Sequence, residues 1–436
     1  MRNLSKTFGK LTIPLLLLLA ISFSAQSAQA KYGGGTGEPN DPYLIYDAKQ
    51  MNAIGADSND WDKHFKLMSD VDLSRYAGTE FNIIGTGYLE VPIIGLPYLV
   101  SIPFTGTFDG NGFEISNFNY SCTDTGFIYC IGLFGVVDGE NAQIKKLVLK
   151  DVDIYVDPGD RIGSLIGILV NGTVIDCYTQ GGSVSGDYRV GGLVGQSADN
   201  VSICNCYTNV NVSGHADIGG LVGDTYYGII SSCYSAGNIT GTGYFVGGLV
   251  GGNYYGSITN SYSTGDVYGI SWRGGLVGEN RGPVSNCYAT GSVPGIGGDG
   301  LIGHGSGTVS NSFWDVNTSG LDYSDGGVGK TTAEMQTMST FTDAGWDFVG
   351  ETINGPNDIW DICEGTNYPK FVWQIPIGDF VCPDGVNFFD YSFFASQWDE
   401  DNCGASNDCD GRDFDLLGSV DIKDLRIFAD NWLAGF

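Results

Sequence analysis

The carboxylates near the C-terminal end of the chain have the spacing of a calcium-binding loop. Such a loop spans twelve residues and places oxygen ligands at positions 1, 3, 5, 7, 9 and 12, with glycine at position 6. Residues 413–424 match this pattern, with Gly418 at position 6 and apolar Val420 at position 8. The expected ligands are Asp413, Asp415, the carbonyl of Ser419, Asp421 and Asp424. Leu417 at position 5 removes one ligand, so the sequence predicts a calcium site with a reduced ligand set.

A second and weaker loop precedes the first one at residues 379–390. Val381 and Pro383 stand where two ligands are expected. The remaining candidates are Asp379, Asn387 and Asp390, with Asp384 as a substitute ligand. Without a cation these crowded carboxylates repel one another. We therefore expect Ca²⁺ binding and folding to be coupled, with the loop at 413–424 binding more tightly.

Each loop is followed by the same apolar pattern at helical spacing. The segments 390–398 and 424–432 share Phe-Ala-x-x-Trp at an offset of 34 residues, which predicts a short helix after each loop. Residues 377–436 resemble a type I dockerin. This resemblance implies Ca²⁺ as the cofactor, a small α-helical domain, and a cohesin-like protein as the partner. The alternative, a solvated acidic tail without a site, leaves the duplicated motif unexplained.

Upstream of the acidic segment, a short glycine-leucine phrase recurs at nearly constant intervals. Its central leucines are Leu133, Leu165, Leu193, Leu221, Leu249, Leu276 and Leu301. A period of 25 to 32 residues indicates units that bury their apolar faces against their neighbours. Each unit holds three short runs of alternating apolar residues between glycine or polar turns. Identical runs one coil apart favour parallel, in-register pairing, so the predicted fold is mainly β, a parallel β-helix.

Equivalent positions in successive units form columns. An aromatic column comprises Tyr178, Tyr207, Tyr234, Tyr262, Tyr288 and Phe313. The position before it is small in every copy and comprises Cys177, Cys206, Cys233, Ser261, Cys287 and Ser312. One residue earlier lies a polar column, expected to hydrogen-bond from coil to coil, of Asp176, Asn205, Ser232, Asn260, Asn286 and Asn311. The pattern does not decide which side the small column faces.

The cysteines divide into two groups. Stacked coils hold equivalent Cβ atoms farther apart than a disulfide prefers, so we expect the thiols of the small column to be mostly free. Elsewhere, Cys122 and Cys130 bracket a short loop and are a candidate pair. One further pair is expected among Cys382, Cys403 and Cys409.

The repeats and their flanking segments resemble the GLUG motif of secreted bacterial proteins. The resemblance covers roughly residues 42–374 and includes the flanks FTGTFDGNG, SFWDVNTSG, GKTTAEMQTMSTFTDAGWDF and YPKFVWQ. It implies a β-solenoid on a cell-surface or secreted protein. It implies no reaction, and the chain has neither an HExxH motif nor more than three histidines.

The chain divides into five expected segments. Residues 1–30 form a signal peptide, because basic residues precede the short apolar run 11–23 and an Ala-x-Ala site predicts cleavage after Ala30. The others are an N-terminal cap with the first coils (31–131), the GLUG-repeat solenoid (132–312), a C-terminal cap (313–376) and the dockerin-like module (377–436). The expected location is secreted or at the cell surface, with no membrane span. A net charge of −30 disfavours nucleic acid as a partner.

Two further groups on the solenoid have residue types that can carry out chemistry or bind sugars. Asp224 and Glu279 share one column two coils apart, about 9.6 Å by strand spacing, which approaches the separation of an inverting glycosidase pair. We expect a shallow position without basic neighbours there, and hence chance alignment and no catalytic residue. The pairs Tyr226-Tyr227 and Tyr254-Tyr255 recur in turns, and exposed rings of this kind can stack on sugar faces. Simple packing at the corner is the favoured interpretation of these rings.

The functional hypothesis is an exported, non-enzymatic β-solenoid that acts as a surface adhesion or scaffold protein with a calcium-dependent docking module. The expected partners are a cohesin-like protein on residues 377–436 and a polysaccharide or cell-surface ligand on the solenoid. The alternative is an extracellular carbohydrate-active enzyme, a polysaccharide hydrolase or lyase, that carries a dockerin. Turnover of polysaccharides would distinguish the two.

Overall fold

The computed structural model describes residues 31–90, 98–123, 126–382, 385–401, 403 and 412–432. The predicted signal peptide and the candidate ligand Asp384 lie outside these residues. None of the helices in the described part of the chain has the length and apolar character needed to cross a bilayer.

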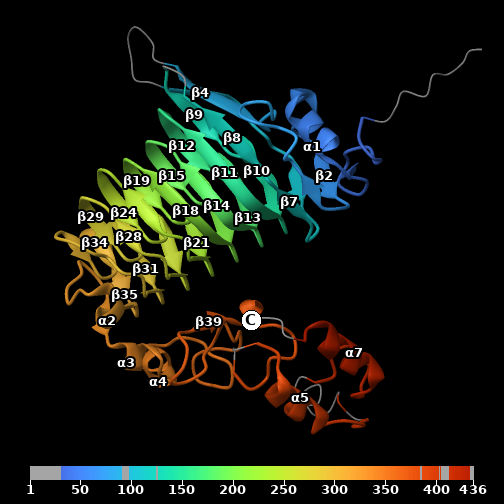
Figure 1. Cartoon of the computed structure of the whole chain (residues 1–436), viewed down its shortest axis with the longest axis vertical. Coiled ribbons are helices and arrows are strands. Elements are labelled where there is room, and N and C mark those ends of the chain that lie inside the picture. The colour runs from blue at the N-terminus through green and yellow to red at the C-terminus, as the bar shows by residue number, and fades with distance from the viewer. Residues whose placement is uncertain are drawn as a thin grey trace, which may run out of the picture. The chain divides into compact units, whose positions relative to one another are not determined.

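Three parallel sheets run along the solenoid, and each coil from residue 128 onward contributes strands to all three (Figure 1). The first sheet contains β1 (Tyr43–Ile45), β2 (His64–Leu67), β6 (Thr107–Asp109), β10 (Phe134–Lys145), β13 (Ile166–Ile175), β16 (Val194–Ser197), β17 (Val201–Cys204), β20 (Val222–Tyr226), β21 (Ile229–Ser231), β25 (Val250–Tyr254), β26 (Ser257–Thr259), β30 (Val277–Asn280), β31 (Val284–Ser285), β34 (Ile302–Gly305) and β35 (Val309–Ser310). The predicted parallel β-helix is therefore confirmed.

The other two sheets complete each coil. The second contains β3 (Val71–Asp72), β7 (Glu114–Ser116), β8 (Asn119–Cys122), β11 (Val148–Val156), β14 (Tyr178–Ser185), β18 (Tyr207–Gly214), β22 (Tyr234–Ser235), β23 (Ile239–Gly241), β27 (Tyr262–Ser263), β28 (Val267–Tyr268), β32 (Tyr288–Ala289), β36 (Phe313–Asp315) and β37 (Val328–Lys330). The third contains β9 (Ile128–Ile131), β12 (Gly159–Gly163), β15 (Tyr188–Gly191), β19 (Ala216–Gly219), β24 (Tyr244–Gly247), β29 (Ser271–Gly274) and β33 (Gly298–Asp299).

The remaining elements lie outside these sheets. They are the antiparallel pairs β4 (Thr86–Glu90) with β5 (Tyr98–Ile102) and β38 (Trp360–Asp361) with β39 (Lys370–Phe371), together with α1 (Ala48–Gly55), η1 (Ser58–Asp60), α2 (Val316–Ser319), α3 (Thr332–Met335), α4 (Met338–Thr342), η2 (Val372–Gln374), α5 (Phe388–Ala395) and α7 (Ile422–Asp430). Asp47 caps α1, and a capping box of Thr331 with Glu334 opens α3.

The leucine phrase forms the corner between the third and first sheets. The seven central leucines are fully buried, and the amide of Leu221 donates to the carbonyl of Leu249 on the next coil at 2.9 Å. A Cβ at Gly219 would lie 2.0 Å from the carbonyl oxygen of Val222, so this corner accepts only glycine. The repeat thus combines one apolar anchor with a turn too tight for a side chain.

The small column faces inward. Cys177, Cys206, Cys233 and Cys287 are fully buried free thiols, as expected, and their Sγ atoms lie near backbone carbonyls such as that of Cys204, 3.1 Å from Cys206. The expected pair between Cys122 and Cys130 is wrong, because Cys130 is a free buried thiol. Its backbone has a φ of 61° at a corner, and its side chain packs against the next coil.

The polar column next to the small residues shapes the corner between the first and second sheets. All six of its members have φ between 45° and 53°, a left-handed conformation that Asn and Asp tolerate better than other side chains. Asn205 Nδ2 also donates to Asp176 Oδ1 at 3.2 Å. The main role of this polar column is therefore to adopt the left-handed corner conformation, and the expected hydrogen bonds between coils are secondary.

The aromatic column forms a stack on the outside of the second sheet. Its tyrosine rings lie 4.4 to 4.8 Å apart from centroid to centroid. Aromatic residues from the segment 313–376 cover this stack, chiefly Trp346, Trp360, Phe371 and Trp373. The hydroxyl of Tyr288 also donates to the carbonyl of Pro369 at 2.6 Å.

Leu221 provides a direct test of this core. We expect Leu221→Asp to lower the free energy of unfolding by several kcal/mol, on the order of 3–5, because an unpaired charge enters an apolar stack. Thr240→Asp, at an exposed strand position of the same coil, is the matched control and should change little. Urea denaturation followed by circular dichroism measures both. Equal effects would contradict the inward leucine column.

Candidate calcium loops and a buried polar network

The last ligand position of the loop at 413–424 ties the loop to its helix. Asp424 is fully buried in the first turn of α7. Its Oδ1 accepts from the amide of Asp415 at 3.1 Å, and its Oδ2 accepts from the amide of Asp421 at 2.8 Å. One carboxylate thereby joins positions 3, 9 and 12 of the predicted loop.

Three carboxylates of this loop converge. Asp413, Asp415 and Asp424 each offer an oxygen that lies within 4.8 Å of the others. Asp413 also accepts from the amides of Leu417 (3.2 Å) and Gly418 (2.7 Å), which fixes its orientation. Among the described residues, Asp415 Oδ2 is buried without a hydrogen-bond donor, 3.7 Å from the ammonium of Lys423. A converging set of hard oxygen donors with one unsatisfied atom fits Ca²⁺.

The other two predicted ligands of this loop lie beside the cluster. Asp421 is the N-cap of α7 and accepts from the amide of Lys423 at 2.7 Å, so its carboxylate also serves the helix terminus. Ser419 lies in the bend between Gly418, whose φ is 92°, and buried Val420. The three carboxylates therefore form the centre of the candidate site.

The loop at 379–390 repeats this geometry with fewer ligands. Asp390 is fully buried and accepts from the amides of Phe380 (2.8 Å), Val381 (3.0 Å) and Asn387 (2.9 Å). Asp379 accepts from the amide of Gly385 at 2.9 Å. Asn387 caps α5, as Asp421 caps α7. The loop closes in the same way around two described carboxylates and one amide.

The two loop-helix units pack through equivalent side chains. Phe394 and Phe428 stack with their ring centroids 5.1 Å apart, and Phe380 and Phe414 stack at 5.8 Å. Val386 and Val420, both at position 8, are fully buried in the same cluster. The two helices were expected from the sequence, and the stacking of the phenylalanines is seen in the structure. Trp398 is 45% exposed.

A disulfide anchors the first loop to the preceding cap segment. Cys382, at position 4 of that loop, is bonded to Cys363. Cys403 is disulfide-bonded as well. The sequence indicated a pair within the C-terminal cluster, but spacing gave no signal that Cys363 takes part. The covalent bond makes the loop part of the cap as well as of the acidic module.

On the solenoid, the column that contains Asp224 and Glu279 is buried and charged. Its register runs from Gln196 through Asp224 and Gly252 to Glu279. Asp224 is 1% exposed and Glu279 is 3% exposed. Arg189 Nε lies 3.2 Å from Asp224, and Arg281 Nε donates to Glu279 at 2.7 Å. The expectation of a shallow column without basic neighbours was wrong.

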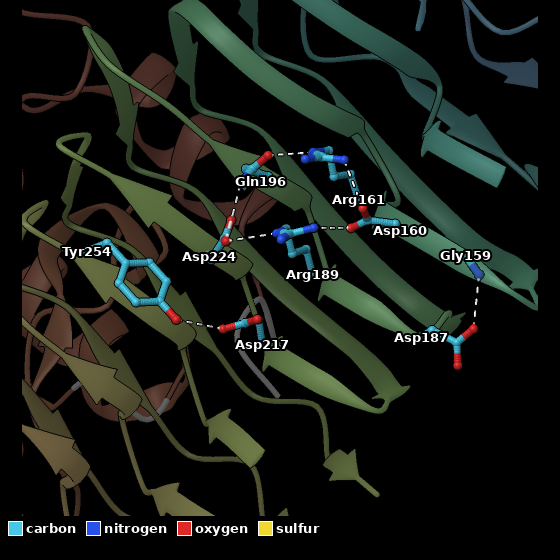
Figure 2. Close-up of polar contacts among 9 residues, drawn as sticks. All are labelled: Gly159, Asp160, Arg161, Asp187, Arg189, Gln196, Asp217, Asp224 and Tyr254. Carbon is cyan, nitrogen blue, oxygen red and sulfur yellow. Dashed lines mark hydrogen bonds and ion pairs between the residues drawn. The ribbon is translucent and has the colours of Figure 1, made fainter. Parts of the chain in front are cut away.

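These side chains belong to two neighbouring hydrogen-bonded groups, one around Arg189 and one around Tyr254, parts of which Figure 2 shows. Arg189 also pairs with Asp160 at 2.6 Å, and Asp160 pairs with Arg161 at 2.9 Å. The hydroxyl of Tyr254 lies 3.1 Å from Asp217 and 3.2 Å from Glu279. Each group joins basic or hydroxyl donors to acidic side chains from more than one coil.

The corner conformation explains why sequence inspection missed this network. Arg161, Arg189 and Asp217 have φ of 64°, 53° and 57°. In Figure 2 the two arginines reach the column of the next coil, where Gln196 and Asp224 lie. Their partners are 35 residues away, and the repeat period alone does not indicate that contact.

Burial controls the ionisation of the acids in the network. Burial raises the pKa of Asp224 to about 8, while Arg189 opposes this shift. The arginine divides its charge between Asp160 and Asp224, and among the described residues Asp224 Oδ1 has no donor. Burial also raises the pKa of Asp217 to about 6, although the hydrogen bond from Tyr254 lowers it in part. A neutral Asp224 is therefore the stable form in the folded chain near neutral pH.

The three parallel sheets define the chain as a β-solenoid protein. A family model of the GLUG motif matches residues 242–268. Halomucin of Haloquadratum walsbyi is 34% identical over 39% of this chain and 2% of its own length. A "Putative Gly-rich membrane protein" of Evansella cellulosilytica is 31% identical over 35% of this chain and 16% of its own length. The chain thus spans a small part of these relatives.

A solved structure shares the fold. It is named a "putative immunoglobulin A1 protease" from Bacteroides ovatus, with a TM-score of 0.53 and 23% identity over 79% of this chain and 96% of the other. At this level of identity the likeness shows the fold alone.

The candidate calcium site predicts a metal-dependent stability. We expect millimolar Ca²⁺ to stabilise the module of the mature chain, by about 2.7 kcal/mol when calcium exceeds its Kd a hundredfold. Asp413→Ala with Asp424→Ala should abolish most of this gain, and Asp379→Ala should remove less of it. Asp430→Ala, an exposed acid at the end of α7, is the control. Calorimetry without heat of binding at millimolar calcium would contradict the site.

Asp224 predicts a pH-dependent stability. The folded chain keeps this proton up to about pH 8, whereas the unfolded chain releases it near pH 4, at the ordinary pKa of about 3.9. The free energy of unfolding should therefore decrease as pH rises between these values. Asp224→Asn should flatten that slope, and exposed Asp199→Asn should not. Urea denaturation from pH 5 to 8 measures the slopes, and equal slopes would show that Asp224 is ionised throughout.

Proposed function

We propose that this protein is an exported, non-enzymatic adhesion or scaffold protein that is attached to a partner through a calcium-dependent module. The observation that carries the proposal is the duplicated loop closure. In both loops the carboxylate at position 12 accepts from the amides of positions 3 and 9 and sits at the start of a helix. Two such units packed through equivalent phenylalanines support a docking role like that of the dockerins they resemble.

Calcium would hold the docking face in place. In the second loop, Asp413, Asp415 and Asp424 are the residues that would bind it. The bound cation supplies positive charge that lets these carboxylates lie close together. The adjacent Phe428 and Trp432 line a mainly apolar groove with Tyr391 and Leu425. A face that combines an apolar groove with exposed polar residues is suited to a cohesin-like protein.

The relatives support the surface part of the proposal. One is named a halomucin and another a membrane protein. The basic start of the chain and its Ala-x-Ala site agree with export to such a location.

The enzymatic alternative receives less support from the geometry. A glycosidase needs two carboxyl groups that flank a bond in an accessible cleft. Asp224 and Glu279 are nearly fully buried, and their neighbours Arg189, Arg281 and Tyr254 bind them. We therefore assign this network to the stability of the coil. Polysaccharide turnover that Asp224→Asn or Glu279→Gln abolishes would reverse this assignment.

A pull-down experiment tests the proposed attachment. The mature chain, with its Cys363–Cys382 disulfide intact, is immobilised and exposed to the secretome of the source organism and to purified type I cohesin. We expect specific capture in calcium and release in EGTA. The Asp413→Ala/Asp424→Ala variant should fail to bind, while Asp430→Ala should bind normally. Capture that neither EGTA nor the double variant affects would refute calcium-dependent docking.

A further inference from the structure

Four tyrosines gather in two stacked pairs where β20 and β25 end. Tyr226 stacks on Tyr254 with the ring centroids 4.9 Å apart and 25° between the planes. Tyr227 stacks on Tyr255 at 5.4 Å and 18°. Tyr227 is 60% exposed and Tyr255 is 55% exposed. We call these four residues the tyrosine platform.

The turn does not itself require these rings. Tyr227 and Tyr255 have φ of 55° and 70°, a conformation that is unfavourable for a bulky side chain. The preceding coil makes its turn with Asn200, at a φ of 57°, a residue type that adopts this conformation readily. Tyrosine therefore occupies a position where asparagine suits the backbone better, and its ring points away from the core.

Tyr254 is held in place before any ligand binds. A Cβ at Gly252 would lie 2.7 Å from the ring of Tyr254, so this glycine makes room for the ring. The hydroxyl of Tyr254 lies within hydrogen-bond distance of Asp217 and Glu279. The guanidinium of Arg281 lies over the same ring, 5.4 Å from its centroid. A fixed surface loses little conformational entropy on binding.

A shallow groove of about 640 Å³ adjoins the exposed rings. Tyr227 and Ile229 form its apolar side, and its polar side contains Asp199, Asn200 and Ser202. A ligand that fills it needs one apolar face for the rings and an edge of hydrogen-bonding groups. Sugar rings have both properties, because their C–H groups lie on the faces and their hydroxyls lie on the edges.

We propose that the tyrosine platform and the adjoining groove bind an uncharged polysaccharide. Charge selects against polyanionic chains, because the protein has a net charge of −30 and Asp199 lies at the groove. Each stacked pair takes one ring from each of two neighbouring coils, so a chain that lies along the solenoid can contact both coils. This inference rests on the adhesive role proposed above and gives that role its ligand, but it does not depend on the calcium module.

Titration calorimetry and affinity electrophoresis of the mature chain test the proposal. The probes are hydroxyethylcellulose, mixed-linkage β-glucan and galactomannan, with polygalacturonate as the charged comparison. We expect binding to at least one uncharged polymer and none to polygalacturonate. Binding to polygalacturonate alone, or to none of the four, would overturn the inference.

Paired variants separate ring stacking from structural damage. Tyr227→Asn with Tyr255→Asn should keep the turn and reduce affinity about tenfold, which corresponds to about 1.4 kcal/mol. Tyr227→Phe with Tyr255→Phe should retain binding, and Tyr268→Ala, an exposed tyrosine outside the platform, should change nothing. The Asp413→Ala/Asp424→Ala variant should still bind the polymer, so failure of docking and failure of glycan binding are distinguishable. Unchanged affinity in the double Asn variant would overturn the inference.

Discussion

The parallel hydrogen bonding of one coil to the next is the interaction on which the rest of the structure depends. At the leucine corner, the amides of Leu193, Leu221 and Leu249 each donate to the leucine carbonyl one coil further on, at 2.8 to 3.0 Å. These bonds form only if every coil makes the same turn, and glycine is required where a Cβ would strike a carbonyl. The repeated phrase therefore constrains the backbone conformation of the turn more strictly than the hydrophobicity of its residues. When every coil makes this turn, the other equivalent residues of successive coils are aligned in register.

Register explains what could be predicted from the sequence. The leucine, cysteine and tyrosine columns recur at the repeat period, so spacing alone places them on neighbouring coils. The convergence of carboxylates in the loop at 413–424 was predictable for a similar reason, because these residues lie within twelve positions of one another. Asp413, Asp415 and Asp424 converge through local backbone geometry that a short motif encodes completely.

Contacts between residues whose sequence separation differs from the repeat period could not be predicted in this way. The pairing of Arg189 with Asp224 depends on a left-handed corner, which turns the arginine toward a different column of the next coil. A mixed column of Gln, Asp, Gly and Glu showed no uniform residue type that would signal its burial. The Cys363–Cys382 disulfide likewise could not be predicted from spacing. It joins the C-terminal cap segment to the loop at 379–390, and no sequence repeat relates these two segments.

The left-handed corners have a general consequence for this solenoid. Residues within the strands are fixed by their neighbours above and below, so substitutions there disturb several coils. At a corner with positive φ the backbone conformation also limits which residue types fit. The chain fills one set of corners with Asn, Asp and Ser and others with arginine, phenylalanine, tryptophan and tyrosine.

The first choice suits the backbone alone. The second places large side chains outside the core at a conformational cost, and Tyr254 ties the platform to the buried network beneath it. Core and surface are thereby separated, so that binding groups can vary along the corners while the coil stays constant.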